Sequence, residues 1–384
     1  MAKMNRPSGA KDQEQLSLHN AIVRTKMPQD IEQRRRTYAT VSNALAHLDN
    51  AQLAALLPSS DQKHGWGGTH VIKVAGTKVF VKKIPLTALE FEQPFNTANH
   101  YNMPTFYNYG VGSAGFGAYR ELVAHIKTTN WALSGACSNF PLMYHHRIVP
   151  FVGEHQSMED DRRRGYVDYW GGDVNIDRYM VERGRASHQI VLCLEYFPHV
   201  AHEWLLKNPR RIEHFIRELY DTALFMRREG MIHFDIHMAN VVVDGYFPYV
   251  ADFGLVNDRS FHLSNAEREF FDLNIDYDPA YVVSAIGTSI YNFYRNAPEP
   301  SKARLAERFG ITDDYRAAVT DLVRNVEIIR ADGLLDLDNY YASYVARNRE
   351  LILIMHDFLC DLRGNPKKDT PFPYLRIDEL VHGQ

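Results

Sequence analysis

Hydrophobic spacing changes from helix-like to strand-like along the first quarter of the chain. Between about residues 28 and 57, leucines recur every three to five positions, which predicts helix. The run VIKVAGTKVFVKKI at 71–84 contains two β-branched segments around Gly76 and Thr77. Short β-branched runs separated by a glycine turn predict a β-hairpin.

The rest of the chain is mostly helical, with one buried strand and one further hairpin. Residues 190–196, IVLCLEY, form a continuous apolar run that is typical of a buried strand. Residues 212–230 carry an apolar stripe at helical spacing that ends at a glycine, and residues 118–131 predict another helix. Two short apolar runs flank Asp244–Gly245 as a hairpin, and beyond about residue 277 the pattern is helical to about 363.

Three stretches do not fit this regular pattern. Residues 1 to about 20 are polar, residues 91–115 are rich in Pro, Asn and Tyr, and residues 153–188 are strongly mixed in charge. We interpret 91–115 as an irregular insertion and 153–188 as a surface excursion. The arginine run 34–36 suits a solvated helix face better than a phosphate or membrane contact.

Composition excludes several classes of protein. The 384 residues are 45% hydrophobic and 23% charged with a formal charge of −4, which argues against a disordered chain and against a broadly basic nucleic-acid binder. The three cysteines are widely spaced, which is typical of reduced thiols. The most apolar stretch, 351–360, contains His356 and Asp357 and is too short for a membrane span. We therefore expect a cytoplasmic protein with no membrane span and no nucleic-acid partner.

The strongest chemical signal is the run HFDIHMAN at 233–240, followed by Asp252-Phe253-Gly254. The spacing is H-x-D-x-x-x-x-N, with 240 − 235 = 5, then D-F-G, with 252 − 240 = 12. Here the sequence resembles the protein-kinase-like superfamily, which includes protein kinases and the aminoglycoside and choline kinase type of small-molecule kinases. The alternative, a hairpin with capping Asp and Asn, explains fewer of the matching positions.

The resemblance implies a role for each polar residue of this segment. Asp235 would orient the acceptor hydroxyl and accept its proton, while Asn240 and Asp252 would be oxygen ligands of Mg²⁺. His237 stands where protein-serine/threonine kinases usually have lysine and where small-molecule kinases have histidine. It would stabilise γ-phosphate charge or hydrogen-bond Asp235. We expect no zinc site at His145–His146 or at His233 and His237.

A second part of the resemblance lies upstream. The superfamily places a glycine-rich hairpin over the nucleotide phosphates, which Gly65, Gly67 and Gly68 match loosely. A lysine at the end of the next strand matches Lys82, which would contact the α- and β-phosphates. Its neighbour Lys83 points to the opposite face of the strand and is expected to be exposed.

The remaining cofactor-binding residues follow from the same resemblance. Glu121 is our choice for the glutamate that pairs with Lys82, and Glu90 and Glu92 are alternatives before Pro94. The run ending at 197 resembles the strand that leads into the hinge between two lobes. Backbone groups of Glu195 and Phe197 would then bind the adenine edge, with Leu194 as gatekeeper.

Some features depart from regulated protein kinases. Phe234 replaces the arginine that usually precedes the catalytic Asp, so activity is expected not to require phosphorylation of the segment after D-F-G. No A-P-E motif follows, and Ser264-Asn265-Ala266-Glu267 resembles a helix capping box.

The resemblance implies an α+β, two-lobed protein-kinase-like fold with a small antiparallel-sheet N-lobe and a larger, mainly helical C-lobe. We expect a polar, helical N-terminal extension (1–60), an N-lobe with insertions at about 85–115 and 153–188 (61–196), and a helical C-lobe with a helical tail (197–384). The expected function is an ATP- and Mg²⁺-dependent kinase acting on a hydroxyl, most simply an atypical Ser/Thr-type protein kinase. The alternatives are a small-molecule kinase of aminoglycoside-phosphotransferase type and a nucleotide-binding pseudokinase scaffold. The partners are ATP and a protein or small-molecule acceptor.

Overall fold

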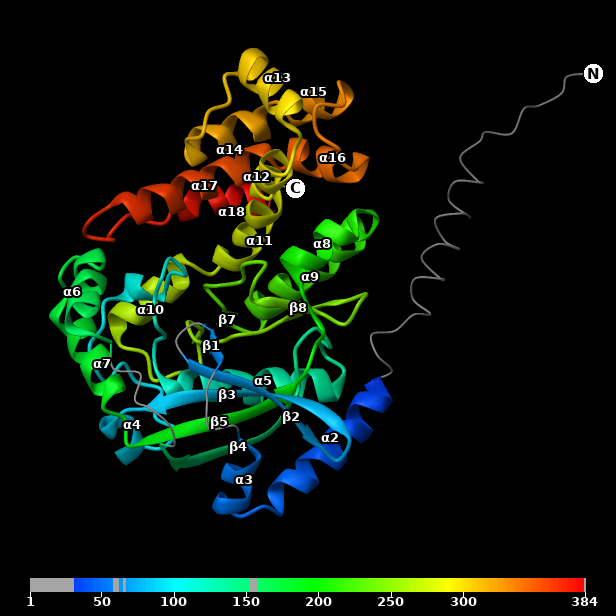
Figure 1. The fold of residues 1–384 in the computed structure, drawn as a ribbon. Helices are drawn as coiled ribbons and strands as arrows, with labels where there is room; N and C mark the ends of the chain where they lie inside the picture. Colours follow the sequence, from blue (N-terminus) through cyan, green and yellow to red (C-terminus); the bar gives the residue numbers. More distant parts are fainter. Residues whose placement is uncertain (1–30, 58–61, 65–66, 152–157, 383–384) are drawn as a thin grey trace, which may run out of the picture.

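Five antiparallel strands form the main sheet in the computed structural model, which describes residues 31–57, 62–64, 67–151 and 158–382 (Figure 1). The strand order is β1-β2-β3-β5-β4. Their bounds are β1 (Gln62–His64), β2 (Gly67–Val74), β3 (Thr77–Leu86), β4 (Met143–Pro150) and β5 (His188–Glu195). The predicted hairpin is confirmed as β2–β3, and Gly76 takes the positive φ of 82° that its tight turn requires.

Helices cover both faces of this sheet. Successive side chains of its central strand, β3, therefore point alternately toward one helical layer and the other. Val79 and Val81 of β3 pack with residues of α2 (Ile31–Ala46) and α3 (Asn50–Leu56). The alternate positions Ile84 and Leu86 pack with α5 (Ala118–Ser134) on the opposite face. Lys82 shares the face of Ile84 and Leu86, so it points toward α5.

This arrangement corrects two predictions about basic residues. Lys83 is 4% exposed, so the prediction that it is exposed is wrong. Arg34 is 2% exposed, so the arginine run is not wholly a solvated helix face, whereas Arg35 and Arg36 are exposed.

The second part of the chain is mainly helical, as its spacing predicts. The apolar helix α11 packs against α9 and α17 at the centre of this part (Figure 1). Two small antiparallel sheets, β6-β8-β9 and β7-β10, lie between the helical part of the chain and the main sheet. The bounds of these strands are β6 (His199–Val200), β7 (Met231–Ile232), β8 (Val241–Val243), β9 (Pro248–Val250) and β10 (Asn257–Asp258).

The remaining elements are short or medium helices. Their bounds are α4 (Ala88–Glu92), η1 (Thr105–Asn108), α6 (Asp160–Tyr169), α7 (Val174–Gly184), α8 (Ala201–Lys207), η2 (Pro209–Arg211), α9 (Ile212–Arg228), α10 (Asn265–Leu273), α11 (Tyr277–Thr288), α12 (Ile290–Arg295), α13 (Glu299–Phe309), α14 (Tyr315–Arg324), α15 (Val326–Ala331), α16 (Asn339–Arg347), α17 (Arg349–Gly364) and α18 (Tyr374–His382). The predicted capping box at Ser264 is confirmed at the start of α10.

The charged stretch 153–188 is more than a surface excursion, which corrects that prediction. Its described part forms α6 and α7, and Trp170, Ile176 and Tyr179 between and within them are almost fully buried. They pack with the irregular segment 99–116. The ring centroids of Tyr107 in that segment and Trp170 are 4.8 Å apart. The two insertions therefore form one packed layer beside the main sheet.

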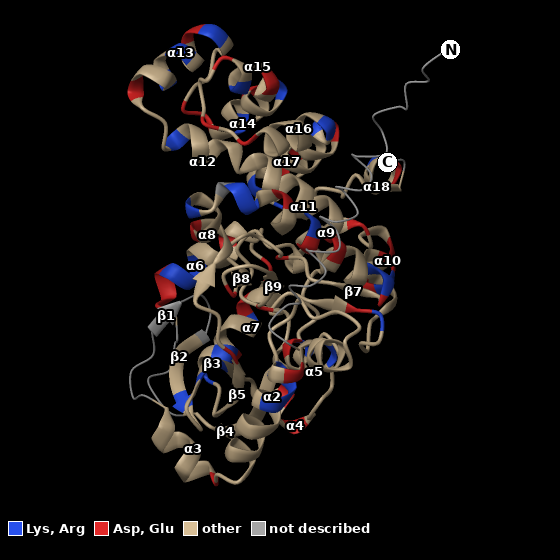
Figure 2. Cartoon of the chain, turned by 90° about the vertical axis from the view of Figure 1, so that its right-hand side faces the viewer, with Lys and Arg blue, Asp and Glu red and all other residues tan. Residues whose placement is uncertain are grey.

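Basic and acidic residues both occur along helices such as α6 and α13 (Figure 2). Within the described residues, no helix combines the length and apolar character needed to cross a membrane.

Candidate active site

Lys82 lies between two carboxylates that come from distant parts of the chain. Its Nζ is 2.7 Å from Glu121 Oε1 on α5 and 2.7 Å from Asp252 Oδ1. Lys82 and Glu121 are largely buried, whereas the Asp252 side chain is 48% exposed. The alternative Glu90 does not take this position, because it caps α5 by accepting from Ala118 N at 2.7 Å.

Lys82 and the two carboxylates of this trio shift one another's pKa values. Burial opposes the charge of Lys82, but the carboxylates of Asp252 and Glu121 more than offset it and raise the lysine pKa. Burial likewise opposes ionisation of Asp252, yet the Lys82 ammonium lowers the pKa of that carboxyl to about 2. Burial raises the pKa of Glu121 above its ordinary value against the pull of Lys82. An ionised, partly exposed Asp252 is therefore available to a cation from solvent.

Asp235 and Asn240 form a second pair in the loop between β7 and β8. Asn240 Nδ2 donates to Asp235 Oδ2 and to the Asp235 carbonyl, both at 2.9 Å. That orientation leaves Asn240 Oδ1 for a metal ion. Burial, reinforced by the charge of Asp252, raises the pKa of Asp235 to about 8. Asp235 is thus poised to exchange a proton near neutral pH.

Two histidines support this loop in their neutral forms. His233 Nε2 donates to Ala251 O at 3.0 Å, and His233 Nδ1 accepts from Asp235 N at 3.2 Å. Burial lowers the pKa of His233 to about 4, which keeps that hydrogen-bond pattern intact at neutral pH. His237 accepts from Ala239 N through Nδ1, and its Nε2 lies 3.6 Å from Asp235 Oδ1. Burial also lowers the pKa of His237.

A backbone hydrogen bond joins the Asp235–Asn240 loop to the segment that contains Asp252. Ala251 N donates to Asn240 O at 2.9 Å, which places Asp252 beside the Asp235–Asn240 pair. Phe234 and Asp252 both adopt left-handed backbone conformations, with φ of 63° and 64°. Non-glycine residues rarely adopt this conformation, and it costs on the order of 1 kcal/mol or more where surrounding contacts hold it.

Asp278, which the sequence reading did not select, holds one of these strained positions. Its two carboxylate oxygens accept from His233 N at 2.5 Å and from Phe234 N at 3.0 Å. Burial raises the pKa of Asp278 to about 7 despite these hydrogen bonds. An acidic residue at the start of an otherwise apolar helix, α11, is the only sequence signal of this role.

Gly110 is a second residue that the sequence reading missed. Its N–H donates to Phe234 O at 3.2 Å, and a Cβ added at Gly110 would lie 2.0 Å from Asp235 Oδ1. The irregular segment 99–116 therefore runs directly against the Asp235 carboxylate. It also contacts the D-F-G segment, because Phe116 N donates to Gly254 O at 2.9 Å.

The predicted hinge residues lie at the end of β5. Glu195 N donates to Leu142 O at 2.8 Å, so this N–H is already engaged. Phe197 packs on Tyr249 with ring centroids 4.2 Å apart. Leu194 is buried on the α5 side of the sheet.

The glycine cluster lies at the β1–β2 hairpin. Gly67 pairs with His64 across that hairpin, and Gly68 is flanked by Lys63 of β1 and Lys83 of β3. Gly65 lies outside the described residues.

The oxygen ligands around Asp252 suit a hard divalent ion. Asp252 offers an ionised carboxylate and Asn240 an amide oxygen, and a Mg²⁺ ion in such sites takes its other ligands from phosphates and water. A different cluster, Asp276, Asp378 and His382, also gathers potential metal ligands. There the Arg227 guanidinium already contacts Asp276 Oδ1 at 2.5 Å and His382 Nε2 at 2.9 Å, so we assign it to an ion-pair network.

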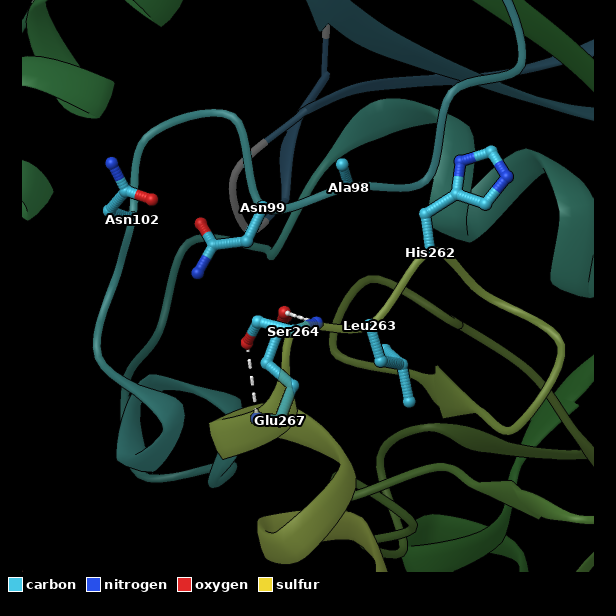
Figure 3. A pocket seen from close by; sticks show the side chains of 7 residues that line it. All are labelled: Ala98, Asn99, Asn102, His262, Leu263, Ser264 and Glu267. Atoms are coloured by element: carbon cyan, nitrogen blue, oxygen red, sulfur yellow. Dashed lines mark hydrogen bonds between the residues drawn. The ribbon is translucent and has the colours of Figure 1, made fainter.

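A pocket of about 350 Å³ lies away from this constellation (Figure 3). It is lined by residues from the segment 98–102 on one side and from the segment 262–267 on the other. The Glu267 carboxylate at its floor is already engaged by Arg120 at 2.6 Å and by the N-terminus of α10. None of the residues predicted for catalysis lines this pocket.

Comparison with known proteins adds no assignment. The sequence matches no protein-family model, and no curated protein is significantly similar to it.

Proposed function

We propose that this chain is an ATP- and Mg²⁺-dependent phosphotransferase that transfers the γ-phosphate to a hydroxyl group. The observation that carries the proposal is Lys82 Nζ, held 2.7 Å from both Glu121 and Asp252, beside the Asp235–Asn240 pair. A fixed cation, an ionised carboxylate and a poised base are the groups that phosphoryl transfer requires.

The trio would hold the nucleotide phosphates. When ATP binds, Lys82 would contact the α- and β-phosphates, while Glu121 keeps the ammonium in place. Mg²⁺ held by Asp252 and Asn240 would neutralise charge on the phosphate oxygens. This preorganised charge is worth more in a partly buried site than in water.

Asp235 would receive the acceptor hydroxyl. Because its pKa is about 8, the carboxylate can accept a proton as the new O–P bond forms. His237 Nε2 carries the ring proton and points toward Asp235 from 3.6 Å, so it would orient this carboxylate or meet a phosphate oxygen.

The fold is compatible with this proposal. The five-stranded sheet with α5 would be the smaller lobe of a protein-kinase-like fold, and the helical part around α11 would be the larger lobe. Residues 195–199 would be the connection between them, with adenine against the Glu195 carbonyl and Phe197.

Two acceptor classes remain in the proposal. The D-F-G-L run favours a polypeptide hydroxyl, as in an atypical Ser/Thr-type protein kinase. A small-molecule acceptor is the second candidate, because Gly110 lies directly against the Asp235 carboxylate and leaves little room for a polypeptide there. A pseudokinase scaffold fits less well, since Lys82, Asp235, Asn240 and Asp252 are all present.

Incubation with γ-labelled ATP and Mg²⁺ tests the proposal and separates these classes. Label on protein, lost in Asp235→Asn, supports a protein kinase, and ATP consumption that needs an added metabolite pool supports a small-molecule kinase. The matched control is Asp272→Asn, which alters an exposed aspartate outside the site. ATP binding without any transfer would contradict the proposal in favour of the scaffold.

A further inference from the structure

Arg34 on α2 is a buried arginine that makes several hydrogen bonds outside the candidate active site. Its Nε and Nη2 donate to Glu195 Oε1 and Oε2 at 3.1 and 2.6 Å. Its Nη1 and Nη2 also donate to the carbonyls of Ser138 and Phe140 at 2.7 and 2.6 Å. The guanidinium is therefore held by four hydrogen bonds while it is almost completely buried.

These contacts converge on the segment that follows β5. Glu195 is the last residue of that strand, and its Oε2 also accepts from Leu142 N at 3.1 Å. The Arg34 guanidinium lies 5.2 Å from the centre of the Tyr249 ring, on which Phe197 packs. One side chain from α2 thus contacts the end of the main sheet and a β9 residue of the helical part.

We infer that Arg34 is a positioning residue for nucleotide binding, so that α2 braces the connection at Glu195–Phe197. The inference rests on the proposed function. Arg34 does not touch the proposed nucleotide position; it acts through the Glu195 side chain, whose backbone carbonyl would face the adenine. A bidentate guanidinium–carboxylate pair fixes both the position and the orientation of its partner.

The chemistry of the pair explains why lysine is a poor substitute. An ammonium keeps the positive charge but cannot make two parallel hydrogen bonds to one carboxylate while also reaching two carbonyls. Arg34→Lys is therefore the informative variant, because it preserves charge and helix propensity and removes the fork. Arg35→Gln is the matched control, since Arg35 lies on the same helix as Arg34, is exposed, and contacts only Leu133 O and the exposed Glu32 among the partners that the structure gives it.

The test combines nucleotide affinity, turnover and hydrogen exchange on the full chain. For Arg34→Lys we expect the Kd for MgATP to rise about tenfold, in the range typical of coupling between protein sites, with kcat at saturating ATP little changed. We also expect faster amide exchange at 195–199 without nucleotide. Arg35→Gln should change neither quantity.

Each other outcome overturns the inference. Unchanged MgATP affinity in Arg34→Lys, a loss confined to kcat, or equal weakening in Arg35→Gln would show that α2 only stabilises the fold. If Arg34→Lys is unstable, the Arg34→Met/Glu195→Met double variant removes both buried charges together, and its Kd for MgATP should also rise. An unchanged Kd in the folded double variant would overturn the inference. A wild-type chain that binds no MgATP would instead refute the proposed function, and the exchange rates at 195–199 would still report whether Arg34 braces the segment.

Discussion

Lys82 Nζ and Glu121 Oε1 lie 2.7 Å apart, although the two residues are 39 positions apart in the sequence. The pair forms because β3 directs Lys82 toward the face that α5 covers. Glu121→Gln keeps the size of the side chain and removes its charge, so Lys82 loses one of the two partners that position it. We expect turnover to fall about a hundredfold, the scale seen when one preorganised charge contact is removed. Steady-state kinetics measure the loss, and Glu92→Gln, which alters an exposed residue at the end of α4, should behave like wild type.

Gly110 predicts a second loss of activity, from a residue with no functional group. The Cβ of Gly110→Ala would meet Asp235 Oδ1 at 2.0 Å, so the carboxylate must move. A shift of about 1 Å in a catalytic group lowers the rate about a hundredfold, so we expect turnover to fall by about that factor. MgATP affinity should be retained, because Lys82 and Asp252 are unchanged. Turnover and nucleotide titration of the same sample separate the two effects. Gly165→Ala, in α6 with open space around it, is the control; full activity in Gly110→Ala would show that Asp235 does not act from this position.

The pKa of Asp235 gives a pH prediction. Burial and the nearby charge of Asp252 raise that pKa to about 8, so the base is protonated and inactive at lower pH. We expect kcat/KM to rise with pH and to level off above about 8. His237→Gln should leave the position of this limb unchanged, because burial and Asp252 cause the shift. A rate that is flat from acid to alkaline pH would assign the base to another group.

Phosphorylation of the segment after D-F-G should be unnecessary. That segment is already held by Asn108 Nδ2, which donates to Leu255 O at 3.0 Å, and by the buried Arg120–Glu267 pair at 2.6 Å. The arginine that would receive a loop phosphate is replaced by Phe234, which is buried. Protein treated with phosphatase should therefore retain its full rate. A rate that appears only after loop phosphorylation, checked by mass spectrometry, would contradict this.

Local patterns predicted much of the fold. The β2–β3 hairpin, strand β5, helices α5 and α9 and the cap at Ser264 each follow from residues close together in the sequence. The motif that contains Asp235 and Asp252 likewise lies within one short stretch, residues 233–254. These features could be predicted because the residues that determine each of them are close together in the sequence.

The features that the sequence did not reveal depend on long-range packing. Arg34 pairs with a carboxylate 161 residues away, and Lys83 is buried although its position on the strand predicted exposure. Gly110 lies against Asp235 only because the 99–116 segment packs on the layer of α6 and α7. Asp278 reaches the backbone of His233 and Phe234 from a helix whose apolar pattern gives no hint of a polar contact.

The most direct test of the account is calorimetric titration of the purified chain with ATP in the presence and absence of Mg²⁺. We predict one binding site per chain that is strengthened by Mg²⁺, with the Mg²⁺ effect lost in Asp252→Asn and retained in the exposed control Asp272→Asn. No ATP binding, or binding whose Mg²⁺ dependence survives Asp252→Asn, would contradict the assignment of this site.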